Sequence, residues 1–358
     1  MAALLQSPPS VSSRWTAIFS PCRVRRCEKL CTVNARREDD YHATLKALQS
    51  RGRTPRKSLG QHYMLNHSIN EQLVKAAEVK EGDVVLEIGP GTGSLTNALV
   101  NSGAMVVAIE KDPHMAMHIG DRFGDTGKVK VLQEDFTRCH IRLHLSSLLG
   151  CDGSTGNRPN STKVVANIPF NITTDVVKQL LPMGDILSQV VLLVQDETAL
   201  RLVDASLGTS EYRPINIFVN FYSDAEYKFK VPRTNFFPQP NVDGAVVSFK
   251  LKQPADYPSI SSPKTFFSMV NSAFNGKRKM LRRSLQHFYA SDAIEEALSN
   301  MGLPTTVSEL RSYIATTQRL WAKMNSIFIH RLCAVQFFRT ASRPYELEIN
   351  FFFLTLLI

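Results

Sequence analysis

The sequence lacks paired cysteines and long apolar runs. Its 358 residues include six cysteines, and none of them belongs to a Cys-x-x-Cys pair. Scattered cysteines indicate neither a zinc site nor a disulfide framework, so we expect no bound metal. The apolar stretch Phe351–Ile358 is far shorter than the ~20 residues that a membrane-spanning helix needs. We therefore expect no membrane association.

Acidic residues are scarce near the N-terminus, and the whole chain carries a formal net charge of +10 at pH 7. Such a surplus suits either a polyanionic partner or a solvated basic surface. Residues 1–35 are rich in Ser and Arg and contain one acid, Glu28, which is typical of an organelle transit peptide. We expect residues 1–35 to direct the protein to the chloroplast stroma and residues 36–56 to form a linker. Mitochondrial import and a disordered native N-terminus are the alternatives.

Segments with strand and helix patterns alternate from residue 57 onward. The predicted elements are a helix at 66–79, strands at 84–88, 105–109, 129–132, 163–166 and 190–194, β-rich segments at 215–221, 226–231 and 245–251, and helices at 265–274, 278–287 and 292–300. Strands separated by helices predict an α/β fold whose parallel sheet is covered on both faces. The spacing of apolar residues changes from a strand pattern to a helix pattern near 252–262. This change predicts two domains, 57–255 and a smaller helical domain, 256–358.

A third glycine is missing from the turn that follows the first predicted strand. A dinucleotide fingerprint needs glycine where Ser94 stands, which disfavours an NAD-dependent dehydrogenase. Enzymes that bind S-adenosylmethionine, which has no pyrophosphate, use a G-x-G-x-G turn with acids after the next two strands. Gly89 and Gly91 begin such a turn, Glu110 is placed to accept from ribose hydroxyls, and Asp135 is placed to accept from the adenine amino group. A purely structural glycine turn is the alternative.

A polar-Pro-aromatic unit follows the strand at 163–166. Asn167 and the Ile168 carbonyl offer two acceptors that could face an adenine amino group and free its delocalised nitrogen lone pair. Pro169 stiffens the turn, and Phe170 supplies a face on which a base can stack. Because ligands bind at the carboxyl edge of such sheets, this unit predicts methyl transfer to an adenine amino group. An ordinary strand-exit turn is the alternative.

These motifs resemble the ribosomal RNA adenine dimethyltransferase (KsgA-like) family, including its plant chloroplast members, over residues 56–303. The segments Lys57–Tyr63 and Phe236–Asp243 also match that family. The resemblance implies a Rossmann-like class I S-adenosylmethionine-dependent methyltransferase domain followed by a smaller helical domain. It also implies that the cofactor is contacted by His62, Met64, Gly89, Glu110, Asp135 and Asn167. Phe236 would be the second face that stacks on the target adenine.

The resemblance further implies N6,N6-dimethylation of two adjacent adenines in the 3′-terminal hairpin loop of small-subunit rRNA. The expected partners are this rRNA and the immature small ribosomal subunit, with the enzyme acting as a monomer. A non-catalytic ribosome-assembly or organellar transcription factor of the same fold is the main alternative. A large-subunit rRNA methyltransferase of the antibiotic-resistance type is another. The intact set of motif residues favours an enzyme.

The helical C-terminal domain contains a concentrated basic segment. Its cations are Lys277, Arg278, Lys279, Arg282 and Arg283. Apolar residues on the other side of the predicted helix would leave these cations free to bind rRNA phosphates. A solvated helix face is the plainer alternative.

The sequence departs from the family pattern at two places. Gly244 stands where the family usually has Ser, from which we expect a minor effect. The segment 305–340 is unfamiliar and delays the expected Arg343–Leu347 motif. We interpret it as an insertion, such as a retained intron or a gene-model error, which affects the C-terminal domain and not the catalytic motifs.

Overall fold

The computed structural model describes residues 55, 60–149, 161–203, 212–258, 260, 262–275 and 281–300. The predicted transit peptide and insertion lie outside these residues, as does the predicted linker apart from Pro55. Internal contacts divide the chain into two units. Among described residues, the first unit comprises 60–203 and 219–256, and the second begins again at Tyr257 and also includes 212–218.

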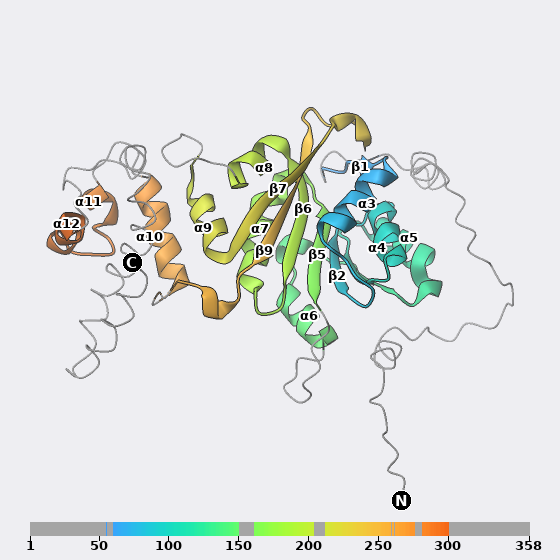
Figure 1. Ribbon diagram of the computed structural model, residues 1–358, viewed down its shortest axis with the longest axis horizontal. Helices are drawn as coiled ribbons and strands as arrows, with labels where there is room; N and C mark the ends of the chain where they lie inside the picture. The colour runs from blue at the N-terminus through green and yellow to red at the C-terminus, as the bar shows by residue number, and fades with distance from the viewer. Residues whose placement is uncertain are drawn as a thin grey trace, which may run out of the picture. The chain divides into compact units, whose positions relative to one another are not determined.

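The first unit is built around a seven-stranded sheet (Figure 1), in the order β4-β3-β2-β5-β6-β9-β7. Its strands are β2 (Val84–Ile88), β3 (Met105–Ile109), β4 (Val129–Leu132), β5 (Thr162–Asn167), β6 (Gln189–Gln195), β7 (Ser223–Val231) and β9 (Gly244–Leu251). The first five strands in the order pair in parallel, as predicted. The sheet is mixed, because β9 pairs antiparallel with both β6 and β7. No long crossover separates β7 from β9, so an antiparallel pair is the accessible arrangement.

Helices of the first unit alternate with its strands. They are α3 (His67–Ala76), α4 (Ser94–Asn101), α5 (Pro113–Phe123), α6 (Ile141–Leu149), α7 (Thr173–Leu180) and α8 (Asp196–Val203). Short 3-10 turns occur at 124–126, 136–138, 170–172, 181–183, 233–235 and 254–256. The helix α3 begins where Asn66 accepts a hydrogen bond from the Ser68 amide through its side chain. An Asn in this position satisfies an amide that the first helical turn leaves without an internal partner.

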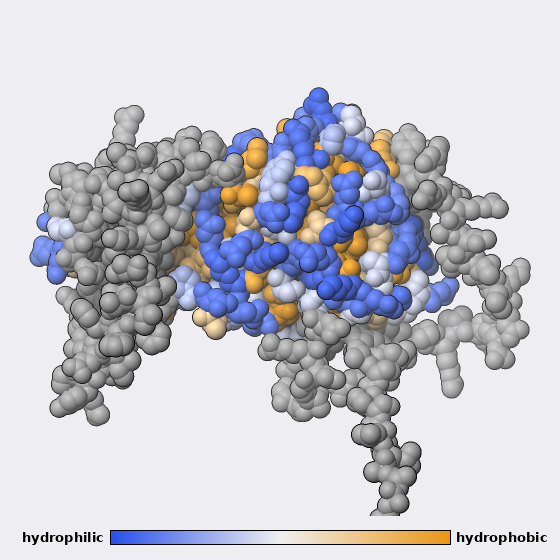
Figure 2. Space-filling model, viewed as in Figure 1, coloured by the Kyte–Doolittle hydropathy of each residue, from blue (hydrophilic) through white to orange (hydrophobic). Residues whose placement is uncertain are grey.

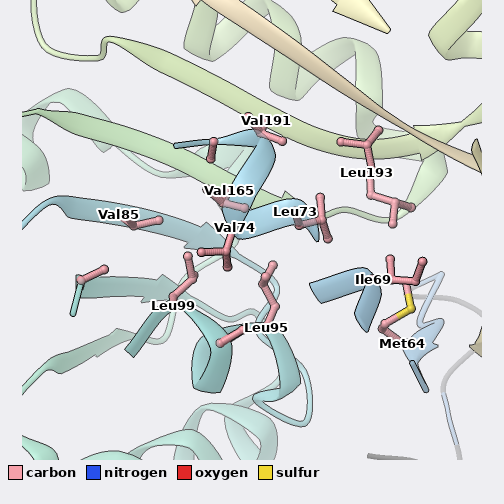
Figure 3. Packing of buried hydrophobic residues seen from close by; sticks show 14 of the residues in the cluster. Met64, Ile69, Leu73, Val74, Val85, Leu95, Leu99, Val165, Val191 and Leu193 are labelled. Atoms are coloured by element: carbon pink, nitrogen blue, oxygen red, sulfur yellow. The ribbon is translucent and has the colours of Figure 1, made fainter. Parts of the chain in front are cut away.

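One face of the sheet is covered by α3 and α4, whose apolar side chains meet those of the central strands (Figure 3). Leu73 of α3 and Leu99 of α4 are completely buried in this cluster, as is Val85 of β2. Successive side chains of a strand point to opposite faces, and the alternate residues Leu86 and Val164 are also buried. Both faces of the sheet are therefore covered, as the sequence predicts.

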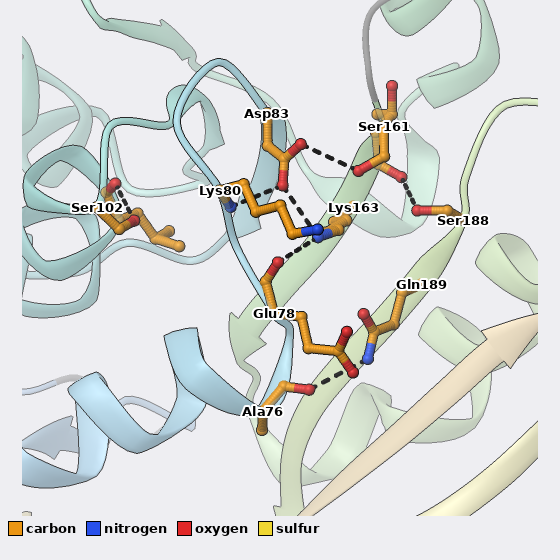
Figure 4. Close-up of polar contacts among 11 residues, drawn as sticks. Ala76, Glu78, Lys80, Asp83, Ser102, Ser161, Lys163, Ser188 and Gln189 are labelled. Atoms are coloured by element: carbon orange, nitrogen blue, oxygen red, sulfur yellow. Dashed lines mark hydrogen bonds and ion pairs between the residues drawn. The ribbon is translucent and has the colours of Figure 1, made fainter.

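A buried ion pair joins β2 and β5 at the edge where these strands begin (Figure 4). Lys163 Nζ lies 2.9 Å from Asp83 Oδ2 and donates to the Glu78 carbonyl oxygen at 2.6 Å. Asp83 also accepts from the Ser161 hydroxyl at 3.1 Å and the Lys80 amide at 2.9 Å. The charges are thus paired and hydrogen-bonded, which is the condition under which buried charges are tolerated.

The segment at 215–221 was predicted to be β-rich, and this prediction is wrong. It belongs to the helix α9 (Pro214–Tyr222). Asn216 and Val219 are buried three positions apart, as one helix face requires. A short apolar run cannot be assigned to a strand or a helix from its pattern alone.

In the second unit, the described residues after Tyr257 are mainly helical. Its later helices are α10 (Pro263–Asn275), α11 (Leu281–Leu285) and α12 (Ser291–Asn300). The Phe218 and Phe267 rings pack with centroids 4.9 Å apart, and those of Tyr212 and Phe274 lie 6.2 Å apart. These contacts place residues 212–218 with the C-terminal helices and not with the sheet.

The surface in Figure 2 is largely hydrophilic, with apolar atoms between the polar ones. Exposed large apolar side chains include Met117, Leu143, Leu200 and Val242. Within the part of the chain that the structure describes, no helix has the length and apolar character to cross a membrane.

Candidate functional site

A pocket lies at the carboxyl ends of β2, β3, β4 and β5, where the sequence places its motifs. The residues that line it are 60–64, 87–92, 94–95, 109–111, 134–137 and 167–172, together with Asn70 and Phe236. Every predicted cofactor residue and every predicted adenine residue belongs to this lining. The parallel order of the strands brings these distant segments together.

The glycine turn forms the floor of the pocket. Gly89 and Gly91 have φ values of +66° and +55°, in the left-handed region that favours glycine. A Cβ at Gly89 would project into open space, whereas one at Gly91 would lie 3.0 Å from the Tyr63 ring. Gly89 therefore leaves room for a ligand against the backbone, and Gly91 allows Tyr63 to approach.

Glu110 is held at the end of β3 by backbone amides. Its Oε1 accepts from the Asp112 amide at 2.8 Å, and its Oε2 accepts from the Gly91 amide at 3.3 Å. Burial raises the pKa of Glu110, although these amide hydrogen bonds oppose the rise. The carboxylate is fixed beside the glycine turn, in a position to accept from hydroxyl groups of a ligand.

Asp135 follows β4 and is oriented by two neighbours. The Lys111 ammonium lies 2.8 Å from Asp135 Oδ2, and Thr137 donates to Oδ1 from its hydroxyl at 2.8 Å and its amide at 3.1 Å. The hydrogen bond from Lys111 is the main cause that lowers the pKa of Asp135. Lys111 was not predicted as a site residue, although it directly follows Glu110 in the sequence.

Asn167 is the last residue of β5 and faces the N-terminal segment. Its Nδ2 donates to the His62 carbonyl oxygen at 3.4 Å, which leaves Oδ1 as the amide atom for an incoming amine. Ile168 is buried, and Pro169 has φ −55° and ψ 130°, an extended conformation that turns into the 3-10 turn at Phe170. The structure thus places the four motif residues along one wall of the pocket.

The N-terminal segment lines the pocket and contains a short strand, β1 (Tyr63–Met64). It pairs antiparallel with β8 (Phe236–Phe237), with Tyr63 opposite Phe237 and Met64 opposite Phe236. A Cβ at Gly60 would lie 3.2 Å from Pro169 Cβ, so this segment also approaches the Asn167–Phe170 motif closely. Residues 57–59 of the segment Lys57–Tyr63, which matches the family, lie outside the described part.

The two predicted stacking aromatics differ in exposure. Phe170 is half-buried and its ring stacks towards His62, with centroids 6.3 Å apart and planes inclined by 22°. Phe236 lines the same pocket but is only 2% exposed, and it packs in the core cluster beside Val246 and Leu193. One face of Phe236 is therefore a core contact. A Cβ at Gly244 would lie 3.6 Å from this ring and 3.1 Å from Leu193, so a Ser there would press on the same packing.

Two buried or partly buried acids near the pocket were not predicted. Glu87 accepts from the Thr96 hydroxyl at 2.7 Å, and burial raises its pKa to about 8. Glu134 Oε1 lies 3.1 Å from His144 Nε2. Together with Cys139, these residues place three atoms that could ligate a metal ion within 4.8 Å of one another. Burial, together with Glu134, raises the pKa of Cys139 to about 12, so its thiol stays protonated and donates to the carboxylate. This cluster is held by hydrogen bonds and supports the loop that carries Asp135.

The predicted rRNA-binding cations are described only in part. Lys277, Arg278 and Lys279 lie outside the described residues. Arg282 lies in α11, and Arg283 follows it there with an exposed side chain. The basic segment is thus a prediction that the described residues leave mostly untested.

Known proteins share both the sequence and the fold. Residues 52–318 match the family described as Ribosomal RNA adenine dimethylase. A chloroplastic ribosomal RNA small subunit methyltransferase of Arabidopsis thaliana is 68% identical over 270 residues, 75% of this chain and 78% of that protein. Ribosomal RNA small subunit methyltransferase A of Protochlamydia amoebophila is 37% identical over 256 residues, 71% of this chain and 86% of that protein.

Two solved structures share the fold at low sequence identity. A dimethyladenosine transferase from Plasmodium falciparum has a TM-score of 0.55 at 21% identity, covering 74% of this chain and 98% of its own. The 23S rRNA methyltransferase ErmE has a TM-score of 0.50 at 21% identity, covering 74% and 99%. At 21% identity the two solved structures show only a shared fold, whereas the family match and the 68% identical relative show the family. The chain belongs to the ribosomal RNA adenine dimethylase family.

Proposed function

We propose that this chain dimethylates N6 of two adjacent adenines in the 3′-terminal hairpin loop of small-subunit rRNA in the chloroplast stroma. Membership of the family makes it an rRNA methyltransferase that uses S-adenosylmethionine. The observation that supports the proposal is that Asn167–Phe170, the glycine turn, Glu110 and Asp135 all line the same pocket. The name of the Arabidopsis relative supports small-subunit rRNA as the substrate and the chloroplast as the compartment.

The residues of the pocket fit S-adenosylmethionine. The open space beside Gly89 is where a ligand can lie against the backbone. Glu110 offers carboxylate oxygens that suit ribose hydroxyls, and the ionised Asp135 suits the adenine amino group. His62 and Met64 would bind from the N-terminal segment that lines the pocket.

The chemistry needs a positioned amine more than a strong base. The N6 lone pair of adenine is delocalised into the ring, and hydrogen bonds from N6 to Asn167 Oδ1 and the Ile168 carbonyl would favour a tetrahedral nitrogen. Phe170 would stack on the base, and Phe236 would close the opposite side. Bound S-adenosylmethionine supplies an electrophilic methyl group on its sulfonium. Methylation makes the amine acidic, so orientation is the main contribution of the protein.

The helical second unit would dock on rRNA through Lys277, Arg278, Lys279, Arg282 and Arg283. The exposure of Arg283 on α11 supports this assignment. An unpaired loop adenine costs less to unstack than a duplex base, which suits a hairpin-loop target. The immature small ribosomal subunit is the proposed partner, and the monomer is the proposed active form.

Transfer of labelled methyl groups to immature small subunits tests this function. The wild type should incorporate label into N6,N6-dimethyladenosine within the 3′-terminal hairpin. Asn167→Ala should reduce the rate about 100-fold, the scale on which loss of an active-site hydrogen-bonding group acts. The control Asn101→Ala, at the exposed end of α4, should leave it unchanged. Equal incorporation by wild type and Asn167→Ala would overturn the mechanism, and binding without incorporation by the wild type would favour an assembly factor.

A further inference from the structure

Asn70 is a buried polar residue that neither the motifs nor the proposed mechanism uses. It lies in the first half of α3, is 0% exposed and contributes to the lining of the pocket. Its Nδ2 donates to the Ser94 hydroxyl at 2.8 Å. Among the described residues, its Oδ1 has no hydrogen-bond donor.

A buried acceptor without a donor is destabilising, and native proteins rarely keep one without a reason. Ser94 is the first residue of α4, directly after the glycine turn, so the Asn70 side chain is held against the ligand-binding loop. The neighbouring residues Ile69 and Leu95 point into the core cluster and fix both helices (Figure 3). The amide therefore has a fixed position in the pocket lining, and its Oδ1 lacks a hydrogen-bond donor.

The order of the strands indicates which part of the cofactor meets Asn70. Asp135 and Glu110 follow β4 and β3 and would hold the adenosine, whereas Asn167 follows β5 and would hold the reacting amine. The glycine turn after β2 lies between them. The methionine part of the cofactor would therefore lie against the first turns of α3 and α4, which form the remaining wall of the pocket.

The α-ammonium is the hydrogen-bond donor of that methionine part, because the carboxylate can only accept. We propose that Asn70 is a cofactor-positioning residue whose Oδ1 accepts a hydrogen bond from the α-amino group of S-adenosylmethionine. The proposal rests on the proposed function of the pocket. The acid Glu87 also lines the pocket, but it accepts a hydrogen bond from Thr96, and burial raises its pKa to about 8. The neutral Asn70 amide is therefore the acceptor that we assign to the α-amino group.

Calorimetric titration of the full chain with S-adenosylhomocysteine and two analogues tests the proposal without measuring activity. One analogue lacks the α-amino group and the other lacks the carboxylate. The wild type should bind the deaminated analogue about tenfold more weakly than S-adenosylhomocysteine, a typical effect of one hydrogen bond to a charged group. In Asn70→Leu this penalty should vanish, while the penalty for the missing carboxylate should persist.

Thr96→Val is the matched control, because it removes another buried polar side chain of the same region and leaves Asn70 intact. It should keep both penalties. A tenfold amino penalty that survives in Asn70→Leu would overturn the proposal. A lost carboxylate penalty would also overturn it, because the amide would then present Nδ2 to the pocket and Oδ1 to Ser94.

A second variant covers the case in which Asn70→Leu does not fold. Asn70→Asp keeps the shape and the acceptor and adds a negative charge, so its amino penalty should exceed that of the wild type; an unchanged penalty would overturn the proposal. Glu110→Ala tests the pocket separately. Loss of S-adenosylhomocysteine binding there, with unaltered amino penalties in the Asn70 variants, would leave the proposed function standing and remove the role of Asn70.

Discussion

The His62 Nδ1 atom lies 2.6 Å from the carbonyl oxygen of Pro238, a residue 176 positions further along the chain. Because a carbonyl can only accept, Nδ1 carries the proton in this contact. The hydrogen bond extends the pairing of β1 with β8 and connects the N-terminal segment that lines the pocket to the loop that follows Phe237.

His62→Ala should weaken the binding of S-adenosylhomocysteine about tenfold, because it removes this hydrogen bond and the ring that stacks towards Phe170. Calorimetry measures the effect. His67→Ala is the matched control, since His67 lies outside the pocket lining and pairs with Glu71 one turn along α3. Equal affinities for wild type and His62→Ala would show that the segment contributes nothing to binding.

A comparison of Gly89→Ala with Gly127→Ala should distinguish the effect of backbone strain on stability from the effect of an added methyl group on ligand binding. Gly89 and Gly127 both have positive φ, +66° and +61°, and a Cβ at either would meet nothing within 4 Å. Each Ala variant should therefore lose about 1 kcal/mol of unfolding free energy. Only the Gly89 variant places a methyl group in the pocket, so only it should lose more than about tenfold in cofactor affinity. Equal affinities in the two variants would contradict the assigned floor of the pocket.

Glu87 should make the protein less stable as the pH rises. Burial raises its folded-state pKa from 4.5 to about 8. Between these values the unfolded chain releases a proton that the folded chain keeps, so unfolding becomes easier with increasing pH, by at most about 1.4 kcal/mol per unit. Glu87→Gln should remove this contribution in denaturant titrations between pH 5 and pH 8. The control Glu71→Gln, at an exposed position, should retain the wild-type dependence of unfolding free energy on pH. The same dependence in Glu87→Gln would show that Glu87 has an ordinary pKa in the folded protein.

Lys163→Met should lower the unfolding free energy by about 3 kcal/mol, because it leaves the Asp83 carboxylate buried without its cation. Lys228→Met breaks the more exposed pair with Glu226 and should cost less than about 1 kcal/mol. Chemical denaturation of both variants measures the difference. Similar losses would mean that the Lys163–Asp83 pair is no better placed than a surface pair.

Reversal of the basic segment should act on RNA binding. Replacing Lys277, Arg278, Arg282 and Arg283 by Glu should weaken binding to small-subunit rRNA and reduce the dependence of log K on log salt, because fewer counterions are released. Filter binding at several salt concentrations measures both quantities. Lys75→Glu, on the exposed side of α3, is the control. Unchanged affinity and slope in the reversed variant would assign this helix a structural role.

The parallel strands, and the grouping of the motif residues at one edge of the sheet, could be predicted because both depend on local patterns. The runs at Val84–Ile88 and Met105–Ile109 are continuous and apolar, and strands of this kind lie buried in parallel sheets. The acids that follow such strands reach the same edge. Glu110 and Asp135 therefore share a pocket, as expected from their positions.

The remaining features depend on tertiary contacts that no local pattern encodes. The helix at Pro214–Tyr222 has a β-like composition, and its burial decides its conformation. The pairing of Met64 with Phe236 brings together residues far apart in the chain, each in a two-residue strand. The burial of Asn70 and the raised pKa of Glu87 follow from what packs around them. Asn70 and Glu87 thus line the pocket without belonging to any recognisable motif.

The β1–β8 ribbon has a consequence for a reaction that needs two methyl groups on one nitrogen. The strand that lines the proposed cofactor pocket and the strand that carries Phe236 pair with each other. Under the proposed function, separating these strands to renew the cofactor would also loosen the wall against which the adenine would rest. Retention of a half-modified base and exchange of the spent cofactor would thus be opposing demands on the same two short strands.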